Sequence, residues 1–219
     1  MIITSRENEH IKLLRKLLGR SKARREEKCF VIEGINPVAE ALKRGLAREL
    51  VLSGGLKDSA GVFPEKVQEL ITEADRQSVV VTEVAKTLFD SISDTVTPQG
   101  VMAVTRMPEY DRRSVLSVEN CKLLCLEDVR DPGNIGTIIR TAEGAGMDGI
   151  LFSSGCADVY QPKVVRSTMG SVLRVPCFFC EGSMTDELSS LKKEDFTLYA
   201  SHLQGSTDYR APAYDGRIG

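Results

Sequence analysis

Residues 131–146 have the sequence Asp131-Pro132-Gly133-Asn134-Ile135-Gly136-Thr137-Ile138-Ile139-Arg140-Thr141-Ala142-Glu143-Gly144-Ala145-Gly146. They lie between two short apolar runs, Leu123–Leu126 and Ile150–Phe152, which are typical of buried strands in a parallel sheet. Between these runs the apolar residues recur at helical spacing, and Asn134 is a suitable N-cap, so we predict a helix over 134–145. The pattern predicts a strand–loop–helix–strand unit, and ligands of open α/β sheets bind in such loops.

Arg140 lies off the apolar stripe of this helix, with Gly136 one turn before it and Glu143 one turn after it. Two interpretations are open. Arg140 is a solvated side chain paired with Glu143, beside a glycine that allows close packing. Alternatively, the bare backbone beside an exposed arginine lets a substrate approach closely. Spacing alone favours the first interpretation.

The order Asn134, then Arg140, then Thr141-Ala142-Glu143 resembles the first motif of the SpoU (TrmH-like) family. This family consists of S-adenosylmethionine-dependent RNA 2′-O-ribose methyltransferases with the SPOUT fold. Three further segments resemble the family and follow its order: Phe30–Gly34, Thr97–Val101 and Pro162–Ser171. The resemblance therefore covers nearly the whole chain and implies a ribose methyltransferase of RNA, with ribosomal RNA favoured over transfer RNA.

The resemblance implies an α/β protein with two domains. A small N-terminal α/β domain that binds the RNA substrate is expected over 1–106, and a SPOUT-type (α/β knot) methyltransferase domain over 116–219. The polar residues around Met107–Arg113 are typical of a linker, which we place at 107–115.

The resemblance also implies roles for individual residues. Arg140 is the expected catalytic arginine, as a base or as a stabiliser of charge; a guanidinium holds its proton tightly and makes an unusual base. Asn134 is expected to hydrogen-bond the ribose or the turn, and Glu143 to orient Arg140. Arg166 and Ser167 suit phosphate binding, although a structural arginine is nearly as well supported.

The methyl donor implied by the family is S-adenosylmethionine, and Ser201, His202 and Leu203 are expected to border its site. The chain reaches Gly219 about where the second family motif would begin, so we expect the domain to stop before the knot. The expectation is then that these 219 residues do not bind the donor. A non-catalytic RNA-binding module is the alternative function, and a homodimer is expected for the complete enzyme.

Positive charge is concentrated at the N-terminus. Residues 1–30 contain nine Lys or Arg against four Glu, whereas the net charge of the whole chain is −2. Such an asymmetry indicates contact with a phosphate backbone, although a basic run is often only a solvated helix face. The cations expected to contact RNA are Lys22, Arg24 and Arg25. No aromatic residues are interleaved with them, so base stacking is not indicated there.

Six cysteines are interpreted as reduced core thiols, and no metal site is expected. The sequence has no apolar run of 18 residues and no signal peptide, so we expect a cytoplasmic protein without a membrane segment. A Rossmann-type nucleotide enzyme is a weak third possibility, because Asp131–Gly136 is not the dinucleotide fingerprint.

The remaining elements follow from apolar runs and turn residues. In the first domain, beyond a basic N-terminal helix, we expect strands at 30–32, 50–52, 79–81 and 101–104, with helices at 36–44, 64–75 and 83–89. In the second we expect strands at 122–127, 149–153, 173–179 and 196–200, with helices at 134–145, 162–170 and 184–192.

Overall fold

The computed structural model describes residues 2–205 and 207–219, which form two compact units. The first comprises Met1–Pro108 and Asp158–Leu173, and the second comprises Glu109–Ala157 and Arg174–Gly219. The segment 158–173 thus groups with the N-terminal unit, although it was expected to belong to the second domain. The boundary at 107–115 stays a prediction.

The first unit is a mixed five-stranded sheet in the order β1-β4-β3-β5-β2. β1, β4 and β3 are parallel, whereas β5 is antiparallel to both of its neighbours. The strands are β1 Ile2–Ile3, β2 Cys29–Glu33, β3 Ala47–Ser53, β4 Val80–Val84 and β5 Val101–Arg106. Their helices are α1 Glu9–Gly19, α2 Ser21–Glu27, α3 Ile35–Lys43, α4 Glu65–Arg76, α5 Lys86–Ile92 and α8 Pro162–Ser167, with 3₁₀ turns at Gly54–Leu56 and Ser171–Leu173.

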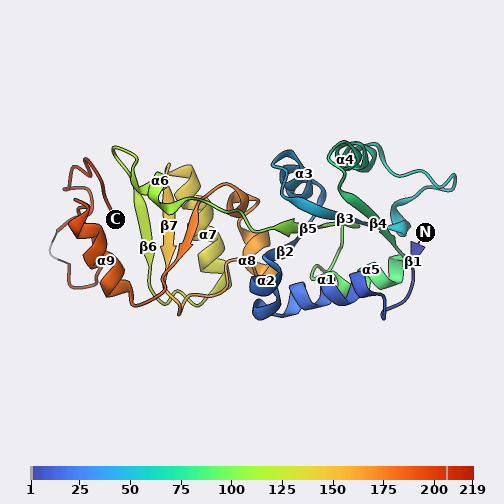
Figure 1. The fold of residues 1–219 in the computed structure, drawn as a ribbon, viewed down its shortest axis with the longest axis horizontal. Coiled ribbons are helices and arrows are strands. Elements are labelled where there is room, and N and C mark those ends of the chain that lie inside the picture. The colour runs from blue at the N-terminus through green and yellow to red at the C-terminus, as the bar shows by residue number, and fades with distance from the viewer. Residues whose placement is uncertain (1, 206) are drawn as a thin grey trace. The chain divides into compact units, whose positions relative to one another are not determined.

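Helices cover both faces of this sheet. In Figure 1, α1 and α5 lie along one face and α3 and α4 along the other. The apolar stripe of α1 (Ile11, Leu14 and Leu17) is buried with Leu88 and Phe89 of α5 against the sheet. Burial of this apolar area is the main contribution to the stability of the layer.

The basic N-terminal region forms two helices rather than one. The helical conformation is interrupted at Arg20, which has an extended backbone conformation (φ −129°, ψ 114°). This break turns α2 away from the direction of α1, and Lys28 then ends α2 in the left-handed conformation (φ 49°).

The second unit contains the parallel sheet expected from the sequence, in the order β6-β7-β8. Its elements are β6 Leu123–Leu126, β7 Gly149–Phe152, β8 Cys177–Phe179, α6 Arg112–Leu116, α7 Pro132–Gly144 and α9 Met184–Lys193. Phe152 of β7 and Phe179 of β8 stack with ring centroids 5.6 Å apart.

Three expected boundaries in this part of the chain were wrong. The strand expected at 173–179 begins only after Pro176, because proline has no N–H to donate to a ladder. The helix expected at 162–170 ends at Ser167. Instead of a strand at 196–200, Thr197 makes a single parallel bridge to Ile218, which also bridges Lys122 in parallel.

All six cysteines are free thiols. Burial raises the pKa of Cys121 and of Cys125 to about 11, which makes both thiols unreactive at neutral pH. Among residues 2–205 and 207–219, no helix is long and apolar enough to cross a bilayer.

Candidate active site

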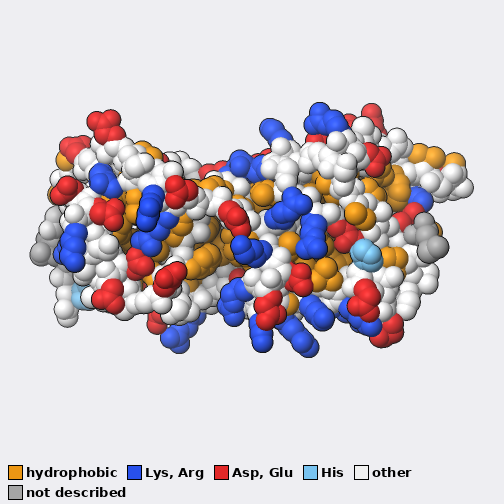
Figure 2. All heavy atoms as spheres, viewed as in Figure 1, with side chains coloured by type: hydrophobic (Ala, Val, Ile, Leu, Met, Phe, Trp, Pro, Cys, Tyr) orange, Lys and Arg blue, Asp and Glu red, His pale blue; other side chains and the backbone are white. Residues whose placement is uncertain are grey.

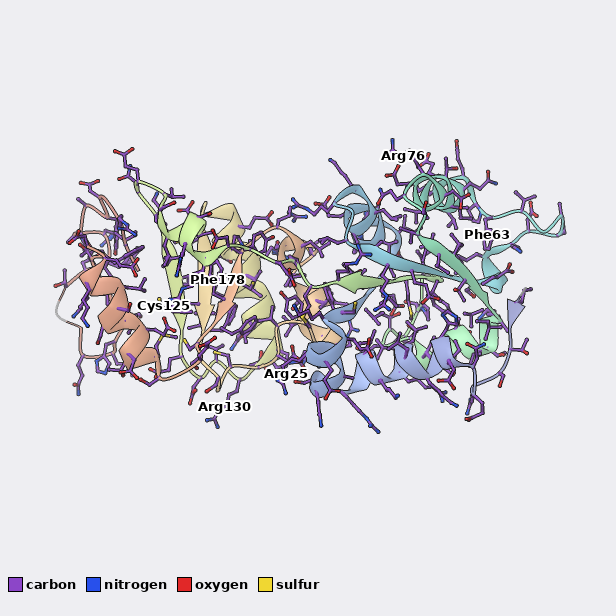
Figure 3. All side chains as sticks on the ribbon, viewed as in Figure 1. Arg25, Phe63, Arg76, Cys125, Arg130 and Phe178 are labelled. Atoms are coloured by element: carbon purple, nitrogen blue, oxygen red, sulfur yellow. The ribbon has the colours of Figure 1, made fainter. Side chains whose placement is uncertain are left out.

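The parallel topology brings four loops of the second unit to one edge. Because β6, β7 and β8 run in the same direction, the chain leaves all three at the same side of the sheet. Thr197 is parallel to Ile218, and Ile218 is parallel to Lys122, so the chain after Thr197 emerges there too. This carboxyl edge is where open α/β sheets bind ligands. The loop after β6, which contains the labelled Arg130, is visible in Figure 3.

Helix α7 begins two residues earlier than the sequence predicted. Asp131 is the N-cap, and its Oδ1 accepts a hydrogen bond of 2.8 Å from the backbone N–H of Asn134. Pro132 takes the first helical position, where its missing N–H costs nothing. Asn134 is therefore the third residue of the helix, and its exposed side chain is not used as the cap.

Asn134 and Arg140 both lie on the exposed side of α7. The opposite side is buried and consists of Ile135, Gly136, Ile139 and Ala142. Gly136 thus packs into the protein, so the idea that its backbone lies bare to a substrate was wrong. The exposure of Asn134 and Arg140 leaves both side chains accessible to a large ligand.

Glu143 is joined to Arg174, which follows the 3₁₀ turn. Arg174 Nη2 donates to Glu143 Oε2 at 3.0 Å, and its Nε donates to Oε1. This fork-to-fork pair fixes the end of α7 on the segment before β8. The role of Glu143 in orienting Arg140 stays a prediction.

A network at the carboxyl edge was not anticipated from the sequence. The hydroxyl of Ser153 accepts from the backbone N–H of Asp128 at 3.0 Å and donates to Asp128 Oδ1 at 3.2 Å. Asp128 has a left-handed backbone (φ 53°), and a Cβ on Gly155 would lie 1.8 Å from its Oδ1. The run Ser153-Ser154-Gly155 directly after a strand was the available signal. This network holds the loop that leads to Asp131 and Asn134.

The residues expected at the donor site lie in the loop after Thr197. A cavity of about 560 Å³ opens in this loop. Its described lining residues are Tyr199, Ala200, Ser201, His202, Gly205, Thr207, Asp208, Tyr209, Pro212 and Tyr214. The rings of Tyr199 and Tyr214 lie 4.8 Å apart. Ser201 and His202 thus line this cavity, whereas Leu203 is fully exposed and is not one of its described lining residues.

Of the three N-terminal cations expected to contact RNA, two are available and one is not. Lys22 and Arg25 are exposed on α2, and Figure 2 shows Lys and Arg side chains gathered over α1 and α2. Arg24 is only 4% exposed. Its Nε and Nη2 donate to Asp158 Oδ2 at 3.0 and 2.6 Å, so assigning it to a phosphate was wrong.

Arg166 and Ser167 lie at the end of α8, in the first unit. Arg166 pairs with Asp94, and both side chains are partly exposed. The hydroxyl of Ser167 donates to the carbonyl of Val164 at 2.8 Å, inside its own helix. The structure therefore does not gather Arg166 and Ser167 with Arg140 in one unit.

No group of three or more His, Cys, Asp or Glu side chains suited to a metal occurs within residues 2–205 and 207–219. Cys177 is the first residue of β8 and Cys180 directly follows the strand, and the two form no such group.

Comparison with known proteins agrees with this architecture. The model of the SpoU rRNA Methylase family matches residues 122–218, and the MRM3-like substrate binding domain matches residues 8–103. The 23S rRNA (guanosine(2553)-2'-O)-methyltransferase RlmP of Bacillus subtilis is 32% identical over 209 residues, which cover 95% of this chain and 76% of that protein.

Two further matches extend this result. The mitochondrial rRNA methyltransferase 3A of Danio rerio is 35% identical over 170 residues, which cover 74% of this chain but only 36% of that longer protein. The AdoMet-bound rRNA methyltransferase from Sinorhizobium meliloti superposes with a TM-score of 0.84 at 30% identity, covering 100% of this chain and 78% of that one. The resemblance seen in the sequence is confirmed, and the chain belongs to the SpoU rRNA methylase family.

Proposed function

We propose that this protein methylates the 2′-hydroxyl of a ribose in ribosomal RNA, with S-adenosylmethionine as the methyl donor. The observation that carries the proposal is the similarity to a 23S rRNA 2′-O-methyltransferase along 95% of the chain. The AdoMet-bound relative of the same fold supports the choice of donor. The second unit then carries out the chemistry, and the first binds the RNA, with the boundary at 107–115.

Arg140 is the residue on which the reaction depends. The guanidinium of Arg140 offers five N–H donors and no acceptor. It therefore acts by stabilising the negative charge that develops on the 2′-oxygen, and by holding the adjacent phosphate, rather than by accepting the proton. Its place on the exposed side of α7 supports this role.

Asn134 orients the ribose. Because Asp131 caps α7, the amide of Asn134 is released from capping and is exposed one turn into the helix. An amide offers both a donor and an acceptor, which suits a sugar hydroxyl. Asp128 and Ser153 fix the loop before it, and in this way they limit the positions that Asn134 takes.

Contrary to the expectation that these 219 residues do not bind the donor, the loop after Thr197 contains a cavity with the size and lining of a small-molecule site. About 560 Å³ lies in the range of small-molecule sites, and its walls combine tyrosine rings with hydroxyl groups. When bound, S-adenosylmethionine supplies an electrophilic methyl group on sulfur. Tyr199 and Tyr214 would contact the adenine, and Ser201 and His202 would hydrogen-bond the polar parts.

RNA is held by cations of the first unit. Lys22, Arg25 and their exposed neighbours on α1 and α2 contact the phosphate backbone, with Arg166 adding a further contact from α8. The exposed ion pair of Arg166 with Asp94 contributes little stability, so exchange of Asp94 for a phosphate costs little.

The protein is further proposed to be a homodimer in the cytoplasm, where bacterial ribosomal RNA is made. Support for the dimer comes from an apolar groove of about 360 Å³ between β6 and α7. Its lining includes Leu124, Leu126, Ile138 and Met147. Such a groove is stabilised when a second apolar surface covers it.

The test is a transfer assay with protein-free ribosomal RNA and S-adenosylmethionine labelled on the methyl group. We expect label in RNA at nucleotides that resist alkaline cleavage, because a methylated 2′-oxygen cannot attack the neighbouring phosphate. Calorimetry with S-adenosylmethionine alone measures donor binding separately. RNA binding with neither donor binding nor transfer would favour the alternative, a non-catalytic RNA-binding module.

A further inference from the structure

A second cavity lies in the first unit, far along the chain from α7. It has a volume of about 430 Å³ and opens where β3 and β4 end and β5 begins. Its lining comes from three segments: the end of β3 and the 3₁₀ turn after it, with Ser53, Gly55 and Leu56; helix α5, with Lys86 and Asp90; and the loop before β5, with Thr95, Val96, Thr97, Pro98 and Gly100. The walls therefore combine hydroxyl groups, the ion pair of Lys86 with Asp90 and a few apolar side chains.

The loop before β5, residues 93–100, is fixed by side-chain hydrogen bonds near both of its ends. Near its start, the hydroxyls of Ser93 and Thr95 both donate to Glu33 Oε1 at 2.7 Å. Near its end, Gln99 Oε1 accepts from the backbone N–H of Ile35 at 3.0 Å. The loop is thus hydrogen-bonded to the end of β2 and to the start of α3.

Two glycines show that the cavity walls are in tight contact. A Cβ on Gly55 would lie 2.8 Å from the side chain of Lys86. A Cβ on Gly100, which has a left-handed backbone (φ 74°), would lie 2.7 Å from Leu56. A side chain at either position would have to displace its neighbour, so glycine is the residue that suits these two approaches.

Val96 stands at the mouth of this cavity and is fully exposed. Covering an exposed aliphatic side chain with a flat apolar surface is favourable, because apolar area is removed from water. Because hydrogen bonds fix the loop at Thr95 and at Gln99, on either side of Val96, they also restrict the position of the Val96 side chain. The face of a nucleobase is a surface of this kind.

Cations stand beside the same loop. Asp94, two residues before Val96, pairs with Arg166 of α8. Lys86 lines the cavity itself and pairs with Asp90 at 2.6 Å. The site thus has an apolar rim for a base, hydroxyl groups for the polar edge of the base, and two partly exposed ion pairs whose cations can exchange a carboxylate for a phosphate.

We propose that this cavity binds one unpaired nucleotide of the ribosomal RNA substrate, with Val96 against the base and the Thr97 hydroxyl on its polar edge. Proteins that read RNA sequence mostly bind unstacked bases in loops and bulges, because the grooves of A-form RNA hide the base edges. The proposal rests on the proposed function, since it takes ribosomal RNA as the substrate, and it gives the first unit a part in choosing the target.

The experiment measures the affinity of the full chain for protein-free ribosomal RNA at several salt concentrations. Val96→Ala and Thr97→Val are the test variants, because both positions are exposed and both changes preserve the fold. Val96→Ala is expected to weaken binding about tenfold, and Thr97→Val several-fold. The slope of log K against log salt should stay unchanged, since neither residue contacts a phosphate.

Val62→Ala is the matched control, because Val62 is an exposed valine of the same unit that does not line the cavity. It should bind RNA like the wild type. Ultraviolet crosslinking of the wild-type complex should attach a nucleotide to the tryptic peptide Thr87–Arg106, which contains the whole loop.

Wild-type affinity in both test variants, or equal losses in Val62→Ala, would overturn the proposal. The proposed function would then still stand, because methyl transfer by the wild type is measured independently. If the wild type bound no ribosomal RNA at all, the proposed function itself would fail.

Discussion

Asp158 accepts two hydrogen bonds from the guanidinium of Arg24, a residue 134 positions earlier in the chain. The remaining nitrogen of Arg24, Nη1, donates to the carbonyls of Leu17 and Leu18 at 2.6 and 3.2 Å. These carbonyls belong to the last turn of α1, where no helical N–H is left to satisfy them. One buried arginine therefore joins α1, α2 and the segment before α8.

Removal of Arg24 should destabilise the protein strongly. Arg24→Ala leaves Asp158 and two carbonyls without their donor, and loss of one partner of a buried pair costs about 3–5 kcal/mol. Urea denaturation measures this cost. Lys22→Ala, on the same helix but exposed, should change stability by less than about 0.5 kcal/mol. If Arg24→Ala proved as stable as Lys22→Ala, the hydrogen bonds of Arg24 to Asp158 and to α1 would not contribute to stability.

The same residue shows what the sequence could and could not predict. The basic run of residues 12–28 follows directly from the sequence, whereas its contact with phosphate stays a prediction. Which member turns inward depends on the break at Arg20 and on a carboxylate 134 residues away, and neither follows from a local pattern. Apolar periodicity, in contrast, was sufficient to predict β6, α7 and β7, because each buries one face against its neighbours.

The site was predicted in part for a similar reason. The exposure of Arg140 follows from its place off the apolar stripe of α7. The contact between Asp128 and Ser153 depends on two strands meeting side by side, so it became visible only with the sheet. The start of α7 was misjudged because Asn134 and Asp131 are equally good caps, and Pro132 decides between them.

Gly155 should tolerate no side chain. In Gly155→Ala the new Cβ would overlap Asp128 Oδ1, so Asp128 must move and its bonds with Ser153 must break. We expect a loss of about 1–3 kcal/mol in the free energy of unfolding. Transfer activity should fall as well, because the loop leading to Asn134 loses its support.

A second substitution should restore what the first removes. Asp128→Gly takes away the overlapping oxygen and suits the left-handed backbone, so the double variant should regain most of the stability. Gly144→Ala is the control, because a Cβ there meets no atom within 4 Å and alanine is the better helix former. Failure of Asp128→Gly to rescue Gly155→Ala would contradict the overlap as the cause.

The cations of α2 should set the salt dependence of RNA binding. Lys22→Ala with Arg25→Ala removes two phosphate contacts, and each contact contributes about 0.7 to the slope of log K against log salt for single strands. The slope should therefore flatten by about 1.4. The control pair, Lys66→Ala with Arg76→Ala on α4, removes the same charge from another helix. An equal effect of both pairs would indicate net charge rather than specific contacts.

Alkaline pH should weaken the second unit through Cys121. This thiol is completely buried, and burial raises its pKa to about 11, above its ordinary value of 9.0. The folded state therefore holds the proton more tightly than the unfolded state. The contribution of this thiol to the free energy of unfolding is fully present below pH 9. It declines by about 1.4 kcal/mol per pH unit between pH 9 and about pH 11.

Urea denaturation between pH 8 and 11 measures this slope, with Cys121→Ala as the comparison. The variant should show a shallower decline than the wild type, even though its stability at pH 8 is lower because a small cavity is left. Parallel curves for the two proteins would assign the alkaline loss to other groups.

Arg140 should be the residue whose loss affects transfer most. Arg140→Ala removes the donors that stabilise charge on the 2′-oxygen, and loss of such a donor costs about a hundredfold or more in rate. Arg140→Lys keeps the charge but not the fork of N–H groups, so its activity should lie between that of the wild type and that of Arg140→Ala. Because Arg140 is exposed on α7, neither change should alter the urea midpoint.

Three measurements separate this role from simple electrostatic attraction. Single-turnover transfer at saturating RNA should fall in Arg140→Ala, whereas donor affinity should match that of the wild type. Arg76→Ala, which removes an exposed arginine from α4, should leave transfer unchanged. If Arg140→Ala weakened only RNA affinity, and saturating RNA restored the rate, then Arg140 would be a phosphate contact, and the charge stabilisation would have to come from another residue.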